Sequence, residues 1–262
     1  MVREETVFGP IHSRRLGSSL GINLLPTKGK FCNFDCIYCE CGWNKDGRGD
    51  KNLPKAQKVH DELRAKLIKL RDERTVIDNL TFSGDGEPTL NPEFPKIIED
   101  TLLLRDEFYP KAKVSVLSNA TRVHIPAVFD ALRNVDNPIM KIDAPSNELI
   151  ALIDKPAPGY DLARVIEALH RFEGDFVLQT MMLRSPSFDS SSPEVLLPWM
   201  DIVRELKPRM IMIYTIDRPT PASGLEAFTE AQMRSFVKPL LDEGFNFSIK
   251  GYEGVQIKDY YK

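Results

Sequence analysis

Two kinds of hydrophobic pattern alternate along the chain: short apolar runs typical of strands, and segments whose apolar positions recur at helical spacing. The clearest helix covers 55–74, where Val59, Leu63, Leu67 and Leu70 fall on one face. Further helices are predicted over 95–105, 127–133, 162–172, 193–206 and 230–243, and strands over 19–25, 78–83, 113–118, 139–143, 176–183, 210–214 and 245–250.

These elements form about six or seven strand-then-helix units. We interpret the strand segments as apolar runs rather than strict alternations, which favours parallel strands buried on both faces. The sequence shows no internal repeat and no glycine- and serine-rich linker. The pattern therefore predicts an α/β fold and a single domain over residues 1–262, with an N-terminal extension (1–18) and a C-terminal extension (245–262) packed on the core.

Polar or glycine-rich segments follow five of the predicted strands, and turn formation is the alternative role for each of them taken singly. In chain order they are the cysteine segment, 84–87, Ser118 with Asn119, Asp143, and Asp217 with Arg218. The reactive site of a parallel α/β barrel lies at the carboxyl ends of its strands. We therefore expect these segments to converge on one mouth.

Composition narrows the classes of function. The chain has 262 residues, of which 42% are hydrophobic and 28% charged, as in ordinary globular proteins. Its 35 basic and 38 acidic residues give a net charge of −3, so no global positive field attracts nucleic acid. No apolar run reaches the ~18 residues of a membrane span, and the start lacks a signal-peptide pattern. We expect a cytoplasmic protein with reduced cysteines and no membrane association.

All four cysteines lie within ten residues: Cys32, Cys36, Cys39 and Cys41. Disulfides among them would close only small, strained loops, whereas crowded thiolates favour a soft metal or an iron–sulfur cluster. The first three, spaced Cys-x3-Cys-x2-Cys, can bind three irons of a [4Fe–4S] cube and leave the fourth open for a substrate. A fourth ligand, Cys41, would give a closed cluster or a zinc site. We interpret Cys41 instead as a partly buried thiol that acts as a small hydrophobe.

This spacing, with Tyr38 before the third cysteine, resembles the signature of the radical SAM superfamily. Segment 81–90, TFSGDGEPTL, resembles that family's second-strand glycine-glycine-glutamate motif, with Asp85 inserted. Segments 9–23 and 214–224 resemble a narrower branch, the wyosine-synthase-like iron–sulfur oxidoreductases, many of which have no assigned substrate. The resemblance implies a partial (incomplete) parallel (β/α)6 barrel of the radical SAM type.

The resemblance also implies a chemistry. Cys32, Cys36 and Cys39 would hold a [4Fe–4S] cluster whose open iron chelates S-adenosylmethionine. An electron from a donor such as flavodoxin or ferredoxin would cleave this cofactor, and the resulting 5′-deoxyadenosyl radical would abstract hydrogen from an unassigned substrate. The residues implied to contact the cofactor are Tyr38, Gly84, Asp85, Gly86, Glu87, Ser118, Asn119, Asp143 and Gln179.

Candidate substrate-binding residues are Arg14, Arg15 and Arg218, since a guanidinium suits phosphate or carboxylate groups. Salt bridges to acidic loops are the alternative for these arginines. Strand alternation places Lys141 on the same face as Asp143, so these two are expected to pair.

Three other functions stay open: modification of tRNA by a wyosine-type enzyme, formation of a glycyl radical on a partner protein, and a zinc-binding interaction module. The tRNA role is not favoured, because true wyosine synthases carry a second cluster and only one cysteine is left over here.

Overall fold

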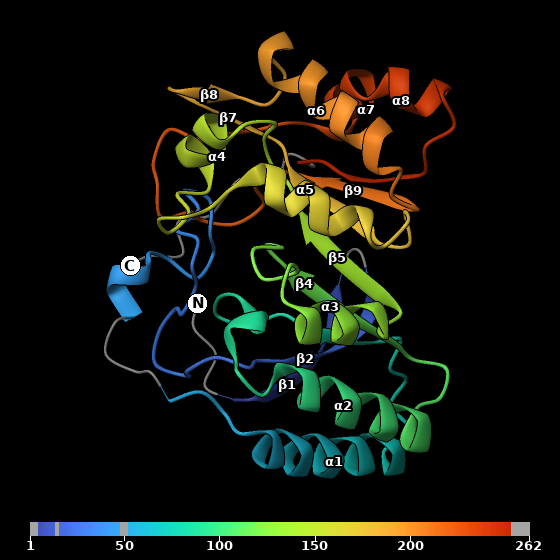
Figure 1. Ribbon diagram of the computed structural model, residues 1–262. Coiled ribbons are helices and arrows are strands. Elements are labelled where there is room, and N and C mark those ends of the chain that lie inside the picture. The colour runs from blue at the N-terminus through green and yellow to red at the C-terminus, as the bar shows by residue number, and fades with distance from the viewer. Residues whose placement is uncertain (1–4, 14–15, 48–51, 253–262) are drawn as a thin grey trace. The chain divides into compact units, whose positions relative to one another are not determined.

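Residues 5–13, 16–47 and 52–252 are described by the computed structural model, which is drawn in Figure 1. The chain divides into two units: unit 1 is Met1–Asn33 with Asn44–Ile139, and unit 2 is Phe34–Trp43 with Met140–Lys262. Cys32 therefore belongs to unit 1, and the other three cysteines belong to unit 2. The single domain over 1–262 stays a prediction, and residues 253–262 of the predicted C-terminal extension lie outside the described residues.

The strands of unit 1 are β1 (Val7–Ser13), β2 (Gly17–Ile22), β3 (Asn79–Phe82), β4 (Lys113–Ser118) and the beginning of β5 (Asn137–Lys141), in that order across the sheet. β2, β3 and β4 are parallel neighbours, as predicted. β1 is antiparallel to β2. β1 was not predicted from the sequence, because its Gly9 and Pro10 interrupt a strand-like pattern.

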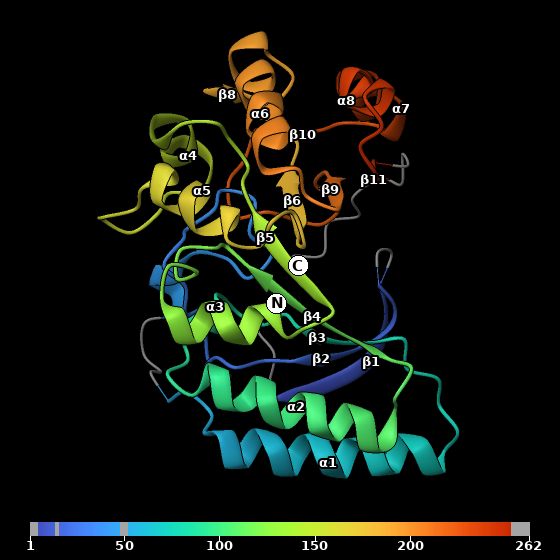
Figure 2. The same cartoon turned by 45° about the vertical axis from the view of Figure 1, so that its right-hand side comes forward.

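The helices of unit 1 are α1 (Ala56–Asp72), α2 (Phe94–Phe108) and α3 (Pro126–Arg133). α1 buries the predicted leucine-rich stripe. In Figure 2, α1 and α2 lie side by side on one side of strands β1 to β4. Phe94 at the start of α2 meets Phe82 of β3 edge to face, with ring centroids 6.4 Å apart. The helices thus pack against the strand face that carries Phe82.

The two faces of these strands differ in polarity. One face carries Leu20, Leu80, Phe82, Val114 and Val116, all fully buried. The other face carries a polar ladder, defined here as Ser19, Asn79, Thr81, Ser115 and Asn137, of which the first four are buried and Asn137 is half-buried. Ser19 and Thr81 share a hydrogen bond of 2.6 Å, Thr81 donates to Asn79 at 3.1 Å, and Asn137 donates to Ser115 at 3.0 Å. Both faces of β3 are buried, as predicted. Polar and apolar residues nevertheless alternate strictly along β3, which differs from the apolar run that we predicted.

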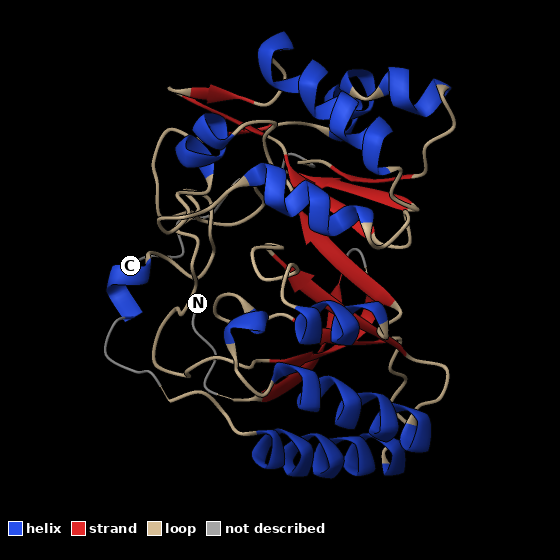
Figure 3. Cartoon of the chain, viewed as in Figure 1, coloured by secondary structure: helices blue, strands red, loops and turns tan. Residues whose placement is uncertain are grey.

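The strands of unit 2 are the end of β5, β6 (Val177–Met181), β9 (Met210–Tyr214) and β11 (Phe247–Lys250), in that order. β6, β9 and β11 are parallel. Three short strands form a separate antiparallel sheet in the order β10 (Glu226–Ala227), β7 (Leu183–Ser185) and β8 (Phe188–Asp189). Both units contain helices and strands (Figure 3), as the sequence pattern predicts for an α/β protein.

The helices of unit 2 are α4 (Asn147–Ile153), α5 (Leu162–His170), α6 (Pro193–Leu206), α7 (Glu230–Phe236) and α8 (Lys238–Asp242). Asp161 caps α5, as a short polar residue at that place indicates. The prediction of a single helix over 230–243 is wrong in one respect. The helix breaks at Val237, two residues before Pro239, which lies in the first turn of α8. Among the described residues, no helix has the length and apolar content needed to cross a membrane.

Candidate functional site

Backbone hydrogen bonds join Phe31, the residue before the first cysteine, to the loop after β3. Phe31 pairs with Gly86, since its N–H donates to the Asp85 carbonyl at 2.8 Å and its own carbonyl accepts from the Glu87 N–H at 3.3 Å. A side chain at Gly86 would place Cβ 1.9 Å from the Phe31 carbonyl oxygen, and the φ of +146° also demands glycine. The close approach that glycine permits here is therefore between two segments of this chain.

Glu87 joins that loop to the end of β4. Its carboxylate is almost fully buried and accepts from the N–H and hydroxyl of Thr89, from Ser118 Oγ at 2.9 Å and from the Asn119 N–H at 2.7 Å. Burial raises the pKa of Glu87, and these donors act in the opposite direction. Unit 1 therefore brings together four consecutive predicted residues, Gly84 to Glu87, with Ser118 and Asn119.

Asn119 also reaches the first cysteine. Its Nδ2 lies 3.9 Å from Cys32 Sγ and donates to Asn33 Oδ1 at 2.7 Å. Asn33 in turn donates to Thr121 Oγ1 at 2.7 Å, and Thr121 donates to Asn119 Oδ1 at 2.7 Å. This closed ring of side chains fixes the amide beside Cys32. Asn33 and Thr121 were not predicted from the sequence, because their residue types alone indicate only turns.

The rest of the cysteine loop lies along the end of α4 in unit 2. Asp35 N–H donates to the Asp154 carbonyl at 2.9 Å, and Ile37 N–H donates to the Ile153 carbonyl at 2.9 Å. Cys39 N–H donates to the Cys36 carbonyl at 3.1 Å, so these two cysteines share one tight turn. Cys36 is buried, Cys39 and Cys41 are half-buried, and each keeps its thiol.

A buried ion cluster stands beside Cys36. Lys141 Nζ lies 3.0 Å from Asp143 Oδ2, forms a second salt bridge with Asp154, and lies 3.2 Å from Cys36 Sγ. Tyr38 donates its hydroxyl to Asp143 and lies 3.2 Å from an oxygen of Asp154. The predicted pairing of Lys141 with Asp143 is confirmed. Asp154 was missed because it follows α4, a helix that the sequence pattern does not reveal.

The charge states in this cluster follow from burial and from the neighbouring charges. Burial by itself lowers the pKa of Lys141, but Asp143 and Asp154 overcome that effect and raise it well above its usual value. Burial raises the pKa of Asp143 to about 7, against the lowering effect of Lys141. Burial also raises the pKa of Tyr38, so its hydroxyl keeps its proton and remains a donor. The lysine is therefore a fixed cation next to Cys36.

Gln179 supplies a buried donor that lacks an acceptor. It lies on β6, and its backbone carbonyl accepts from the Ile142 N–H at 3.1 Å. Its side-chain Nε2 is buried and, in the part of the chain that the structure describes, has no hydrogen-bond partner. An orphaned buried amide indicates a place for a ligand with acceptor oxygens.

The predicted arginines differ in what the structure shows. Arg218 is exposed and forms a 2.7 Å salt bridge with Glu40, which lies between Cys39 and Cys41. This is the pairing with an acidic loop that stood as the alternative role. Arg14 and Arg15 lie outside the described residues.

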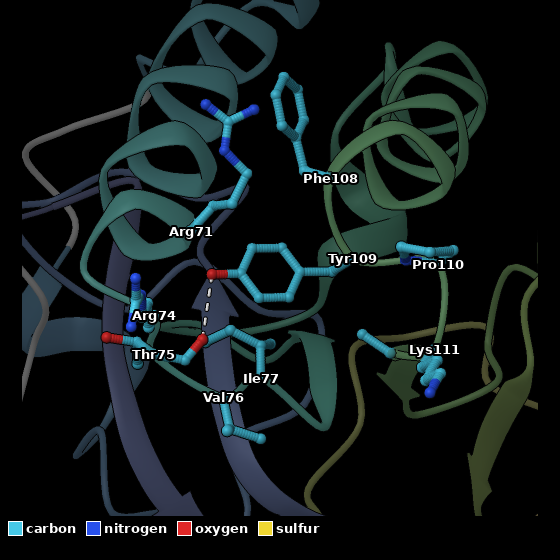
Figure 4. Close-up of a pocket in the computed structure, with 10 residues that line it drawn as sticks. Arg71, Arg74, Thr75, Val76, Ile77, Phe108, Tyr109, Pro110 and Lys111 are labelled. Atoms are coloured by element: carbon cyan, nitrogen blue, oxygen red, sulfur yellow. Dashed lines mark hydrogen bonds between the residues drawn. The ribbon is translucent and has the colours of Figure 1, made fainter.

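Unit 1 also contains a pocket of about 450 Å³ (Figure 4). It is lined by segments 74–77 and 108–112, which come just before β3 and β4, and by Arg71. Tyr109 closes one side by donating its hydroxyl to the Thr75 carbonyl at 3.1 Å. The pocket is thus at the amino ends of the strands, the end of a parallel α/β fold that serves stability rather than chemistry.

Within the described ranges, no three His, Cys, Asp or Glu side chains are grouped as ligands of a single metal ion. A cubic cluster calls for a different arrangement, since each of its irons takes its own thiolate. The thiol donors and the orphaned amide of Gln179 fit a cluster with a cofactor that bears acceptor oxygens.

Comparison with known proteins identifies the family. A family model described as the Radical SAM superfamily matches residues 27–183, which is more than half of the chain. The chain therefore belongs to the radical SAM superfamily, as its cysteine spacing predicted. It is 30% identical to a UPF0026 protein of Helicobacter pylori over 82% of this chain and 67% of that protein. This relationship fits the branch whose substrates are unassigned.

Solved structures show the fold. A radical SAM methyltransferase from Sphaerobacter thermophilus matches with a TM-score of 0.67 and 16% identity over 91% of this chain and 67% of that one. Streptococcus suis SuiB bound to S-adenosylmethionine matches with a TM-score of 0.62 and 16% identity over 86% of this chain. This chain spans about half of SuiB, at 49%. The predicted α/β fold of the partial radical SAM barrel is confirmed, and the chain is an enzyme of that superfamily.

Proposed function

We propose that Cys32, Cys36 and Cys39 hold a [4Fe–4S] cluster and that the chain cleaves S-adenosylmethionine to start a radical reaction on a substrate still to be identified. The observation that carries this proposal is the three-cysteine loop within a chain of the radical SAM superfamily. When bound, the cluster supplies the electron that splits the cofactor. Such thiols need a reducing compartment, which supports a cytoplasmic location and a donor such as flavodoxin or ferredoxin.

The chain's own residues have separable roles in this proposal. The pairing of Phe31 with Gly86 and the amide of Asn119 position Cys32. The backbone bonds from Asp35 and Ile37 to the end of α4 position Cys36 and Cys39. Gln179 would donate to an acceptor oxygen of the cofactor, because its Nε2 is buried without a partner in the described structure. Arg218, held by Glu40, remains our proposed substrate contact, together with Arg14 and Arg15.

The test is anaerobic reconstitution with iron and sulfide, followed by electron paramagnetic resonance with and without S-adenosylmethionine. Cys36→Ala should abolish the cluster signal and the release of 5′-deoxyadenosine. Cys41→Ala is the matched control, since it removes a thiol from the same loop, and it should keep both. A wild-type chain without a cluster signal, or a signal that S-adenosylmethionine leaves unchanged, would contradict the proposal.

A further inference from the structure

The cation beside Cys36 has no part in the roles assigned so far. Lys141 Nζ lies 3.2 Å from Cys36 Sγ, which is within the range of a hydrogen bond to sulfur. Its side chain is only 12% exposed, and the side chains of its partners Asp143 and Asp154 are 0% and 2% exposed. A charged lysine is rarely placed in such a site, because leaving water costs several kcal/mol unless partners compensate.

The surroundings of Lys141 hold its ammonium in one place. Two carboxylates bind it, and the rings of Phe34 and Tyr38 lie 5.4 Å and 4.8 Å from Nζ. Phe34 and Tyr38 flank Cys36 in the sequence, two residues away on either side. The loop that carries the cysteine therefore also encloses the cation.

The two carboxylates exceed what is needed to neutralise one ammonium. When both acids are ionised, Lys141, Asp143 and Asp154 together carry a formal charge of −1, and Tyr38 donates a further hydrogen bond to the carboxylates. The contact with sulfur distinguishes this site from an ordinary buried salt bridge.

We propose that Lys141 is a positioning residue that donates an N–H···S hydrogen bond to Cys36 and thereby raises the reduction potential of the cluster that Cys36 helps to hold. This inference rests on the proposed function, in which Cys36 is a cluster ligand. Hydrogen bonds to the ligand sulfurs and nearby charge are the means by which a protein sets such a potential. A fixed cation stabilises the form of the cluster that carries one more negative charge.

The step affected is the transfer of one electron to the cluster from a low-potential donor, which is dithionite in the test below. No bond to Lys141 forms or breaks, and all three of its protons stay on Nζ. The contribution of Lys141 is therefore measured as a potential and needs no knowledge of the substrate.

The experiment is an anaerobic redox titration of the reconstituted chain, followed by electron paramagnetic resonance. Lys141→Met should lower the ratio of reduced to oxidised cluster about tenfold at a fixed potential, which equals a shift of about 59 mV for one electron. Lys141→Arg keeps a cationic donor and should stay close to the wild-type potential. Lys155→Met is the matched control, because Lys155 lies over the Trp43 ring in the same unit and its ammonium is exposed.

A second variant covers the case in which Lys141→Met does not fold. Lys141→Met combined with Asp154→Asn keeps the formal charge of the cluster of side chains at −1 while removing the N–H···S contact. This double variant should also show the lowered potential, with iron and sulfide content equal to that of the wild type. Its stability is checked by a thermal melt before reconstitution.

The outcomes separate this inference from the function on which it rests. A wild-type chain that assembles no cluster would overturn both. A wild-type cluster whose potential is unchanged in Lys141→Met, or restored in the double variant, would overturn the role of Lys141 alone. A lowered potential in both variants, with Lys155→Met unchanged, would support it.

Discussion

Replacing Glu87 with glutamine tests whether its buried carboxylate joins the loop after β3 to the end of β4. The carboxylate accepts from two groups of Thr89, from Ser118 Oγ and from the Asn119 N–H, and the last bond is 2.7 Å long. A glutamine keeps one oxygen, which can serve Thr89 and Ser118. The NH₂ group of the glutamine would then face the Asn119 N–H, and because both groups are donors, that hydrogen bond is lost.

The magnitude follows from those bonds. Leaving the Asn119 N–H without an acceptor costs about 1–3 kcal/mol, and the remaining bonds lose the strengthening that a charged acceptor gives. Removing the buried charge offsets part of this loss, as the raised pKa of Glu87 indicates. We expect Glu87→Gln to lower the free energy of unfolding by about 2 kcal/mol.

The assay is urea unfolding followed by far-ultraviolet circular dichroism, with Glu99→Gln as the control. Glu99 lies on α2 and pairs with Lys96 at the surface, so its replacement should change stability by less than about 0.5 kcal/mol. Because Asn119 also contacts Cys32, Glu87→Gln should slow reconstitution of the cluster. A variant that unfolds at the wild-type urea concentration would refute the role assigned to Glu87.

Three further predictions follow from single contacts. Gly86→Ala should lower the free energy of unfolding by about 3 kcal/mol in the same urea assay, because its Cβ would meet the Phe31 carbonyl at a positive φ; wild-type stability would contradict this. Burial alone raises the pKa of Asp136, but bonds from Val114, Lys113 and Arg105 lower it overall. Asp136→Asn should therefore be destabilising near neutral pH, and the difference in urea midpoint should vanish as the pH falls through the lowered pKa; a constant difference would argue against the cause. Gln179→Leu removes a buried amide that has no hydrogen-bond partner among the described residues, so it should stabilise the cofactor-free chain by about 1 kcal/mol. The same change should weaken the binding of S-adenosylmethionine about tenfold, as measured by calorimetry. Unchanged affinity would exclude Gln179 from the cofactor site.

Much of the fold could be predicted because its signals are local. The stripe of α1 and the proline at the start of α6 mark those helices within one or two residues. β1 was missed because Gly9 and Pro10 interrupt its strand-like pattern, and α4 was missed because it has only seven residues. The break between α7 and α8 was predictable in principle, since Pro239 stands inside the pattern taken as one helix.

The candidate site divides in the same way. The family could be predicted because the spacing of the three cysteines is itself the signal, whereas their role as cluster ligands stays a prediction. The environment of Cys36 could be predicted only in part. Strand alternation places Lys141 on the same face as Asp143, whereas Asp154 follows α4, a helix that was not predicted from the sequence. Tertiary contacts of this kind need the folded chain.

The polar ladder in unit 1 has a consequence for how the strands find their partners. Side chains change faces with every residue, so a slip of β3 by one position would turn Thr81 towards the helices and leave Leu80 among hydroxyls and amides. The hydrogen bond between Ser19 and Thr81, which joins β2 to β3, would be lost, and these two buried hydroxyls would no longer be partners. A misaligned pairing of these strands therefore costs free energy on both faces of the sheet. This cost favours the native register during folding.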